Sequence, residues 1–257
     1  MGLIRGCVRL AFMGYFNLFY NIDVQGLNNI PKDGGYILVS NHIHWMDPIL
    51  YVCEAKRMVY AIAKEELFST KLKSFIMRRL GLIEVKRNPK DNNTESINEA
   101  VQKLQEGYLL LIYPEGTRFG LKKGIKPKKG VALMAMEAKV PIIPMAMVGS
   151  FVPFTKIKIK IDKPMDISEF YPKDGENPNL RNMVKLTNNV MTKVIELRDE
   201  INTEEIEAEM NEAEEKREMK KQMKLAKKEQ KALKSKEKLK ELPKDGDQWS
   251  PLQINDK

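Results

Sequence analysis

Residues 36–48, YILVSNHIHWMDP, pass from an apolar run through a polar loop into a helical pattern. The run YILVS is typical of a buried strand, because it is short, apolar and bounded by turn-forming residues. Pro48 has the backbone angle that the first turn of a helix requires, and Asp47 before it is a favoured capping residue. The stretch therefore predicts a strand, a loop and a helix, with both histidines of the chain, His42 and His44, in the loop.

The alternation of short apolar runs with helical patterns continues along the chain. Strands separated by helices predict an α/β fold with a mixed, largely parallel sheet flanked by helices. Active sites in such folds gather in loops just beyond strand ends, which is where the two histidines lie. The predicted strands are 36–40, 58–63, 82–85, 109–113, 140–148 and 156–161, and the predicted helices are 48–56, 65–79, 94–106, 128–139 and one starting near residue 179.

Charge is distributed unevenly along the chain, whose net charge is +9. Residues 1–198 hold 30 basic and 19 acidic side chains, whereas residues 199–215 carry nine acidic and no basic side chains. Residues 216–240 carry twelve basic and three acidic side chains. A basic main domain indicates an anionic partner: a nucleic acid, an anionic membrane or a phosphorylated substrate. No interleaving of aromatic and basic residues supports nucleic acid.

The first 22 residues are apolar and aromatic, with Arg5 and Arg9 near the start and no charge from Leu10 to Ile22. This uncharged stretch is too short to span a bilayer, which needs about 20 residues. A membrane-surface helix, with Arg5 and Arg9 at anionic headgroups, is the favoured interpretation. The alternatives are a helix packed on the domain's own core and a secretory signal, although no small-residue cleavage site follows.

His42 and Asp47 suggest acid–base chemistry. On one continuous helix they would point about 140° apart, so they can meet only if His42 lies in a loop. The carboxylate would then fix the tautomer of the ring and leave the other ring nitrogen free as a base. A plainer alternative makes Asp47 a helix cap and His42 an ordinary loop residue. His42, His44 and Asp47 also resemble the start of a metal site, but the chain has no further histidine to complete it, so no metal is predicted.

A second polar group, Glu115-Gly116-Thr117-Arg118, follows the apolar run 109–113. Its backbone N–H groups, hydroxyl and guanidinium suit a phosphate. Residues 81–87, GLIEVKR, place Arg87 at the end of another predicted strand. Glu115 and Arg118 could alternatively pair with each other for structural reasons.

Four sequence blocks together resemble the glycerolipid acyltransferase family, the PlsC-type 1-acylglycerol-3-phosphate acyltransferases. The blocks occur in the family's order and spacing and extend, with Lys64 and Lys129, over about residues 31–165. They are Asn41, His42 and Asp47, then Gly81 and Arg87, then Pro114–Arg118, then Val140–Pro144. The chain departs from the family at His44, Lys86, Tyr113 and Phe119, which puts substrate preference in question more than chemistry.

The resemblance implies a general base, His42, that takes the proton from the free hydroxyl of lysophosphatidic acid, with Asp47 orienting it. The hydroxyl would attack the thioester of acyl-CoA or acyl carrier protein, giving phosphatidic acid without a cofactor. The phosphate would be held by Lys64, Arg87 and Arg118, and the acceptor pocket would be shaped by Glu115, Gly116 and Thr117. Other acceptors (glycerol 3-phosphate, another lysophospholipid, a lyso-aminolipid) and a non-catalytic anionic-membrane binder are the alternatives.

The expected organisation is a membrane-interface helix and linker (1–30), an acyltransferase domain (31–198) and a charged helical or disordered tail (199–257). Two cysteines, Cys7 and Cys53, form neither a disulfide framework nor a metal site, so both thiols are expected to be reduced. The expected location is the cytoplasmic face of the cell membrane, bound peripherally.

Overall fold

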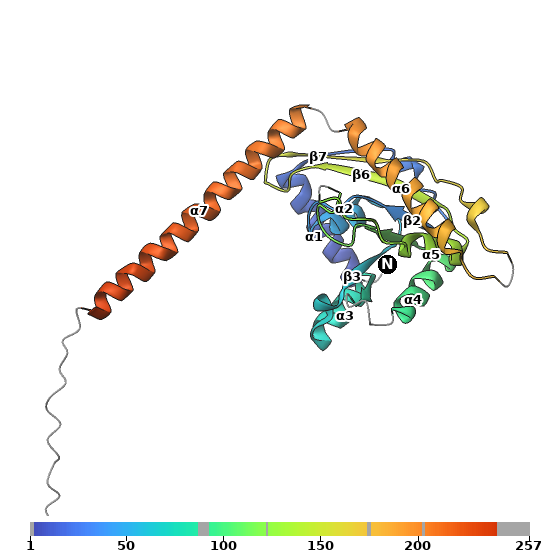
Figure 1. Ribbon diagram of the computed structural model, residues 1–257, viewed down its shortest axis with the longest axis horizontal. Helices are drawn as coiled ribbons and strands as arrows, with labels where there is room; N and C mark the ends of the chain where they lie inside the picture. Colours follow the sequence, from blue (N-terminus) through green and yellow to red (C-terminus); the bar gives the residue numbers. More distant parts are fainter. Residues whose placement is uncertain (1–2, 87–92, 122, 174–175, 202–203, 241–257) are drawn as a thin grey trace, which may run out of the picture. The chain divides into compact units, whose positions relative to one another are not determined.

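The computed structural model of the chain describes residues 3–86, 93–121, 123–173, 176–201 and 204–240. The chain divides into two units, Met1–Met210 and Asn211–Lys257. In the described residues, seven strands of the first unit form one sheet in the order β1-β7-β6-β2-β5-β3-β4 (Figure 1). β6 and β7 are antiparallel, and every other neighbouring pair is parallel. The strands are β1 (Asn21–Gln25), β2 (Tyr36–Val39), β3 (Val59–Lys64), β4 (Leu82–Val85), β5 (Leu109–Ile112), β6 (Ile142–Gly149) and β7 (Lys156–Ile161).

The sheet confirms the predicted α/β fold, with a strand at each predicted position. β1, which the sequence pattern did not predict, pairs in parallel with β7, from Asn21 opposite Lys156 to Gln25 opposite Lys160. β1 lies at the edge of the sheet, where a strand pairs with a neighbour on one side. Its sequence, NIDVQ, is polar and lacks the apolar run that is typical of a buried strand. Residues 21–25, which were expected in a linker, therefore lie in the sheet.

Helices cover both faces of the sheet, because successive strand residues point to opposite sides. Ile37 and Val39 of β2 contribute to one core, which α4, α5 and α6 cover, whereas Leu38 contributes to the other core with α1 and α2 (Figure 1). The helices are α1 (Leu3–Phe19), α2 (Asp47–Glu54), α3 (Lys71–Arg79), α4 (Thr94–Gln105), α5 (Gly130–Ala138), α6 (Leu180–Ile201) and α7 (Glu204–Lys240), with short 3-10 helices η1 (Leu27–Asn29), η2 (Glu65–Phe68) and η3 (Ser168–Phe170).

The region 65–79, predicted as one helix, is divided into η2 and α3. Thr70 lies between them in an extended conformation and caps α3, its hydroxyl accepting from the Lys73 amide at 3.2 Å. A threonine is a favoured N-cap, and its preference for local backbone contacts competes with helix continuation.

α1 packs on the domain by one face. Phe16 is buried in the core shared with α2, and the Arg5 side chain, 3% exposed, donates to the Val59 carbonyl at 2.7 Å. Arg9 donates to the Cys53 carbonyl at 2.8 Å. The expectation that Arg5 and Arg9 face lipid headgroups is therefore wrong, because the fold uses both to satisfy backbone carbonyls.

The other face of α1 is exposed and uncharged. It includes Ala11, Tyr15 and Leu18, which are spaced three or four residues apart and so share one side of the helix, and the exposed Leu10 next to Ala11. α1 thus combines the core helix and the surface helix that the sequence left as alternatives. None of the helices in the described part of the chain is long and apolar enough to cross a membrane.

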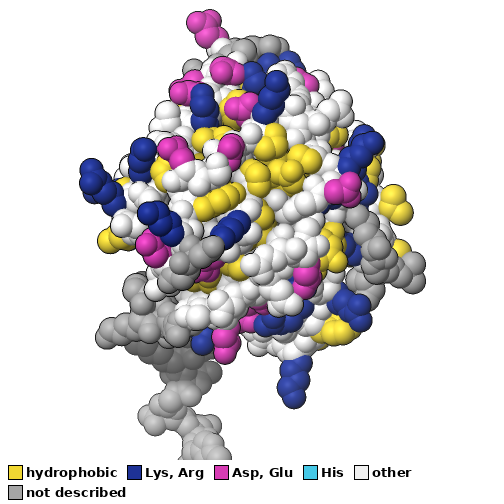
Figure 2. All heavy atoms as spheres, turned by 90° about the vertical axis from the view of Figure 1, so that its right-hand side faces the viewer, with side chains coloured by type: hydrophobic (Ala, Val, Ile, Leu, Met, Phe, Trp, Pro, Cys, Tyr) yellow, Lys and Arg dark blue, Asp and Glu magenta, His cyan; other side chains and the backbone are white. Residues whose placement is uncertain are grey.

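The surface carries charges of both signs. Figure 2 shows one face on which Lys and Arg alternate with Asp and Glu around hydrophobic side chains. Arg78 bonds to Glu84 at 3.0 Å, for example, and Lys103 to Glu106 at 2.7 Å. Some basic side chains of the domain are thus paired with acidic ones, and an anionic partner needs a local cluster of basic side chains.

The charged tail is helical from Glu204 to Lys240, so the helical alternative holds for this stretch. Ile206 is buried with Leu197 and Ile201 of α6, within the first unit. Beyond Met210, the helix belongs to the second unit and bears the exposed Lys216–Glu212 ion pair.

Candidate active site

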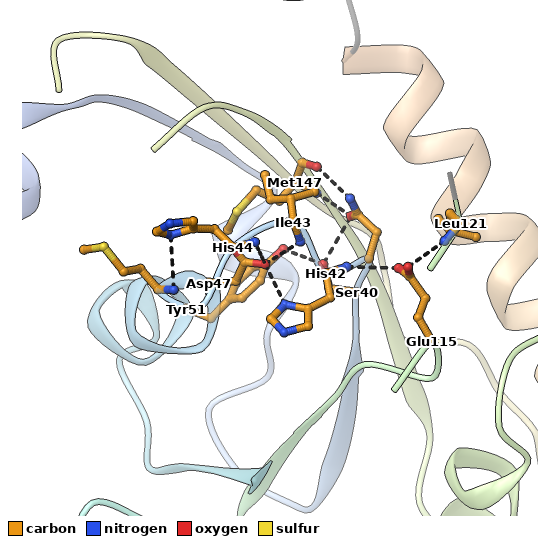
Figure 3. A network of polar contacts seen from close by, with 11 residues as sticks. Ser40, His42, Ile43, His44, Asp47, Tyr51, Glu115, Leu121 and Met147 are labelled. Atoms are coloured by element: carbon orange, nitrogen blue, oxygen red, sulfur yellow. Dashed lines mark hydrogen bonds and ion pairs between the residues drawn. The ribbon is translucent and has the colours of Figure 1, made fainter. Parts of the chain in front are cut away.

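The loop after β2 brings His42 and Asp47 into contact (Figure 3). The distance between His42 Nδ1 and Asp47 Oδ2 is 2.8 Å. The Asp47 side chain is fully buried, whereas that of His42 is 18% exposed. The proton on Nδ1 is thereby directed to the carboxylate, and the opposite ring nitrogen, Nε2, keeps a lone pair for an external proton.

The Asp47 carboxylate is directed back to the loop. It accepts from the Ile43 amide at 2.7 Å and from the His44 amide at 2.9 Å, in addition to the His42 ring. The residue capping α2 is Met46, which makes no side-chain capping bond, so the prediction that Asp47 caps the helix is wrong. An acidic residue in the first turn still complements the positive end of the helix.

The loop after β5 holds both backbone groups of His42. The His42 amide donates to Glu115 Oε1 at 3.0 Å, and the His42 carbonyl accepts from the Phe119 amide at 2.7 Å. The second Glu115 oxygen accepts from the Leu121 amide at 2.7 Å (Figure 3). The loop that contains the third sequence block, Pro114–Arg118, therefore holds His42 of the first block in position.

Glu115 is 2% exposed and serves as a brace between these two loops. Burial raises the pKa of its carboxyl group, and the backbone hydrogen bonds from His42 and Leu121 oppose that rise. Among the described residues, no recorded ion pair or hydrogen bond joins Glu115 to Arg118, so the structural pairing considered for them is not formed. A direct contact of the buried Glu115 with the acceptor, as the family resemblance implies, remains a prediction.

Tyr113 lies flat against the His42 ring. The ring centroids are 4.3 Å apart and the planes are inclined by 22°. The Tyr113 hydroxyl is buried and has no hydrogen-bond partner in the described structure. The sequence showed Tyr113 only as a departure from the family's Phe; the stacking depends on how two distant loops meet.

Asn41 joins the histidine loop to β6. Its side-chain amide donates to the Met147 carbonyl at 2.8 Å and accepts from the Met147 amide at 2.9 Å. An asparagine side chain can pair with a backbone in this way because it carries both a donor and an acceptor. The sequence pattern included Asn41 but gave it no role.

Two of the predicted phosphate-binding residues, Lys64 and Arg118, lie at or beyond the carboxyl ends of strands, as His42 does. Lys64 ends β3, and Gly116, Thr117 and Arg118 follow β5, which pairs in parallel with both β2 and β3. Lys64 and Arg118 are exposed. No contact between these residues and His42 is recorded, and Arg87 lies outside the described residues.

Lys128 is a further cation in this region. Its amide donates to the Pro114 carbonyl at 2.8 Å, and its side chain lies over Gly116, where an added Cβ would be 2.8 Å from Lys128 Cε. Gly116 also has a φ of 62°, which glycine adopts readily. The sequence prediction named the neighbouring Lys129 and missed Lys128. No cluster of three or more His, Cys, Asp or Glu in the described ranges is arranged to hold a metal ion.

Comparison with known proteins identifies the domain. Residues 21–148 match the family model described as acyltransferase. The chain belongs to the acyltransferase family. The matched region begins with β1 and ends in β6, and it includes His42, Asp47 and the loop from Tyr113 to Leu121 that holds the histidine.

The relatives of this acyltransferase include a 1-acyl-sn-glycerol-3-phosphate acyltransferase of Bacillus subtilis (strain 168). It is 26% identical over 187 residues, which cover 70% of this chain and 89% of the relative. A protein of the same name from Borreliella burgdorferi is 27% identical over 145 residues, covering 56% of this chain and 57% of the relative.

The crystal structure of the acyltransferase PlsC from Thermotoga maritima has the same fold. Its TM-score is 0.59 at 24% identity, and the match covers 77% of this chain and 80% of that chain. This chain thus shares its fold with a solved acyltransferase.

Proposed function

We propose that this acyltransferase moves an acyl group from acyl-CoA or acyl carrier protein to the free hydroxyl of 1-acylglycerol 3-phosphate, giving phosphatidic acid. The names of the relatives support this acceptor. The observation that carries the proposed mechanism is the 2.8 Å contact between His42 Nδ1 and Asp47 Oδ2, which prepares Nε2 to act as a base.

In this mechanism, Nε2 of His42 accepts the proton of the acceptor hydroxyl while the hydroxyl oxygen attacks the thioester carbonyl. The new ester forms as the carbon–sulfur bond breaks, and the carrier thiolate leaves with the proton from His42. Asp47 holds the ring and stabilises its cation. A positioned base of this kind contributes about 10²- to 10⁴-fold in rate.

Cations at the same edge of the sheet would hold the acceptor phosphate. The proposed residues are Lys64, Arg87 and Arg118, with Gly116 and Thr117 lining the pocket beside them. Lys128 is added to this set because its side chain crosses Gly116. Arg118 suits the role best, since a guanidinium can donate two parallel hydrogen bonds to one phosphate.

We also propose that the protein binds the cytoplasmic face of the cell membrane peripherally, as its lipid acceptor requires. The uncharged outer face of α1, with Leu10 and Leu18 exposed, supports this. Removing residues 2–22 would not test the idea, because Phe16 and Arg5 would be lost from the core.

An activity panel tests the proposed reaction. Purified protein is offered acyl-CoA and acyl carrier protein with lysophosphatidate, glycerol 3-phosphate and neutral lysolipids. The proposal expects phosphatidic acid from lysophosphatidate as the fastest reaction. A faster reaction with another acceptor would assign that acceptor instead, and no transfer to any acceptor would favour the non-catalytic membrane binder.

A further inference from the structure

α3 is an unusual helix for a folded domain because none of its residues is buried. Leu72 is 69% exposed and Phe75 is 52% exposed. In the described chain, no α3 side chain belongs to any of the three buried hydrophobic clusters or packs against them. A helix of this length has little stability of its own in water, so an exposed apolar face on it suggests a missing partner.

The exposed apolar side chains lie on one side of the helix. Leu72 and Phe75 are three residues apart and are therefore neighbours on the helix surface. Leu67, in the preceding η2, is also about half exposed. In Figure 1, α3 lies at the edge of the sheet that carries β3 and β4.

The charges of α3 itself have one sign, whereas η2 carries Glu65 and Glu66 next to Leu67. Between residues 69 and 81 the chain carries Lys71, Lys73, Arg78 and Arg79 and no acidic residue. Arg78 anchors the helix to the domain by bonding to Glu84 at 3.0 Å and lying over the Phe68 ring. Lys71, Lys73 and Arg79 are exposed, and the Arg79 guanidinium lies over the Phe75 ring.

We propose that α3 and η2 form a docking surface for an anionic lipid bilayer, made of Leu67, Lys71, Leu72, Lys73, Phe75 and Arg79. Apolar side chains flanked by cations fit the boundary between acyl chains and anionic headgroups. This contact is separate from α1, whose outer face carries no charge. The role of this surface, delivery of a lipid acceptor, rests on the proposed function, whereas the membrane contact itself does not.

The position of the α3 surface suits that purpose. Lys64, the last residue of β3, directly precedes η2. Because β2 and β3 both run parallel to β5, the carboxyl end of β3 points in the same direction as the end of β2 that leads into the His42 loop. A bilayer held by α3 would therefore place lipid headgroups near the cations proposed to bind the acceptor phosphate.

Vesicle binding of the full-length protein tests this proposal without turnover. The vesicles are phosphatidylcholine, with and without phosphatidylglycerol. The double variant Leu72→Ser/Phe75→Ser should bind phosphatidylglycerol vesicles at least about tenfold more weakly than the unmodified protein. Lys71→Glu/Lys73→Glu should lose at least as much at low salt, and this loss should shrink as salt is added.

Matched variants control for the number of changes. Leu180→Ser/Val184→Ser removes two similarly exposed apolar residues from α6, and Lys220→Glu/Lys221→Glu reverses two exposed charges on α7. Both should bind vesicles within about twofold of the unmodified protein. Unfolding temperatures of all four variants should match that of the unmodified protein, since the substituted side chains are exposed.

Unchanged vesicle binding by both α3 variants would overturn the proposal. Equal binding to neutral and anionic vesicles by the unmodified protein would overturn it as well. If the α3 variants kept vesicle binding but lost only the reaction with acyl carrier protein, α3 would be a docking site for an acidic protein instead. Because vesicle binding is measured without substrate, a failure of the proposed acyl transfer gives a separate result.

Discussion

His42 is held in place through its ring and its backbone at the same time. Asp47 and Tyr113 contact the ring, while Glu115 and Phe119 bond to the backbone amide and carbonyl. A base held on all these sides loses little freedom when substrate arrives, which is how orientation contributes to rate.

The buried Tyr113 hydroxyl is the one unsatisfied polar group recorded in contact with this arrangement among the described residues. Tyr113→Phe should raise the free energy of unfolding by about 1 kcal/mol, because a buried hydroxyl without a partner is removed. Urea unfolding measures the change. A loss of stability would mean that the hydroxyl is hydrogen-bonded in the folded protein.

The Tyr113 ring itself is expected to matter for turnover. Tyr113→Leu should lower kcat several-fold with a smaller effect on KM, because the His42 ring loses the flat surface that orients it, whereas Tyr113→Phe should restore kcat. Steady-state kinetics of both variants decide this. Equal kcat values for the Leu and Phe variants would remove Tyr113 from the positioning of His42.

The burial of the Glu115 carboxyl group is expected to make the stability of the protein depend on pH. Burial raises the pKa of its carboxyl group in the folded protein, so the folded state holds this proton more tightly than the unfolded state does. The protonated Glu115 carboxyl group therefore adds to the free energy of unfolding below its ordinary pKa of about 4.3. This contribution is lost as pH rises through the raised pKa of the folded protein. Glu115→Gln should remove this fall, as measured by unfolding at a series of pH values. An unchanged pH profile would contradict it.

At the scale of elements, sequence patterns located the strands whose residues either form an apolar run or alternate between apolar and polar. β5, all of whose residues are buried, and β7, with alternating Lys and Ile, are examples. β1 was missed because an edge strand with polar residues has no such pattern. The predicted helix 65–79 failed at Thr70, where a local cap competed with helix continuation.

The site was predictable to a similar extent. The spacing of His42 and Asp47 indicated a loop followed by a helix, and the contact between them followed from that arrangement. The roles of Asn41, Glu115 and Tyr113 were not readable, because each depends on which backbone or ring of a distant segment lies opposite. Tertiary contacts of this kind leave no local pattern.

The two faces of α1 are expected to serve different purposes, the buried face stability and the exposed face membrane binding. Leu10→Ser/Leu18→Ser should weaken binding to anionic vesicles several-fold and leave the unfolding temperature unchanged, because both side chains are exposed. Phe16→Ala should instead cost about 3 to 5 kcal/mol of stability, as expected for a buried aromatic residue. Vesicle sedimentation and thermal unfolding of both variants test this. Unchanged vesicle binding by the Leu10/Leu18 variant would exclude the outer face of α1 as a membrane contact.

At the scale of the whole molecule, the first unit ends at Met210 and contains every residue proposed for catalysis. A chain truncated after residue 210 should keep the unfolding temperature and acyl transfer of the full chain. Truncation after residue 199 should destabilise it, because the buried Ile201 and Ile206 are lost. Thermal unfolding and activity of both truncations are the measurements. Loss of activity after the first truncation would give the charged tail a part in the reaction.

The central claim is that His42, oriented by Asp47, is the base for acyl transfer to a lysophospholipid hydroxyl. Its most direct test is the rate of phosphatidic acid formation by His42→Ala, measured with folded protein at saturating donor and acceptor. The predicted result is a loss of about 10² to 10⁴ in kcat, with an unfolding temperature close to that of the unmodified protein. A kcat equal to that of the unmodified protein would contradict the claim.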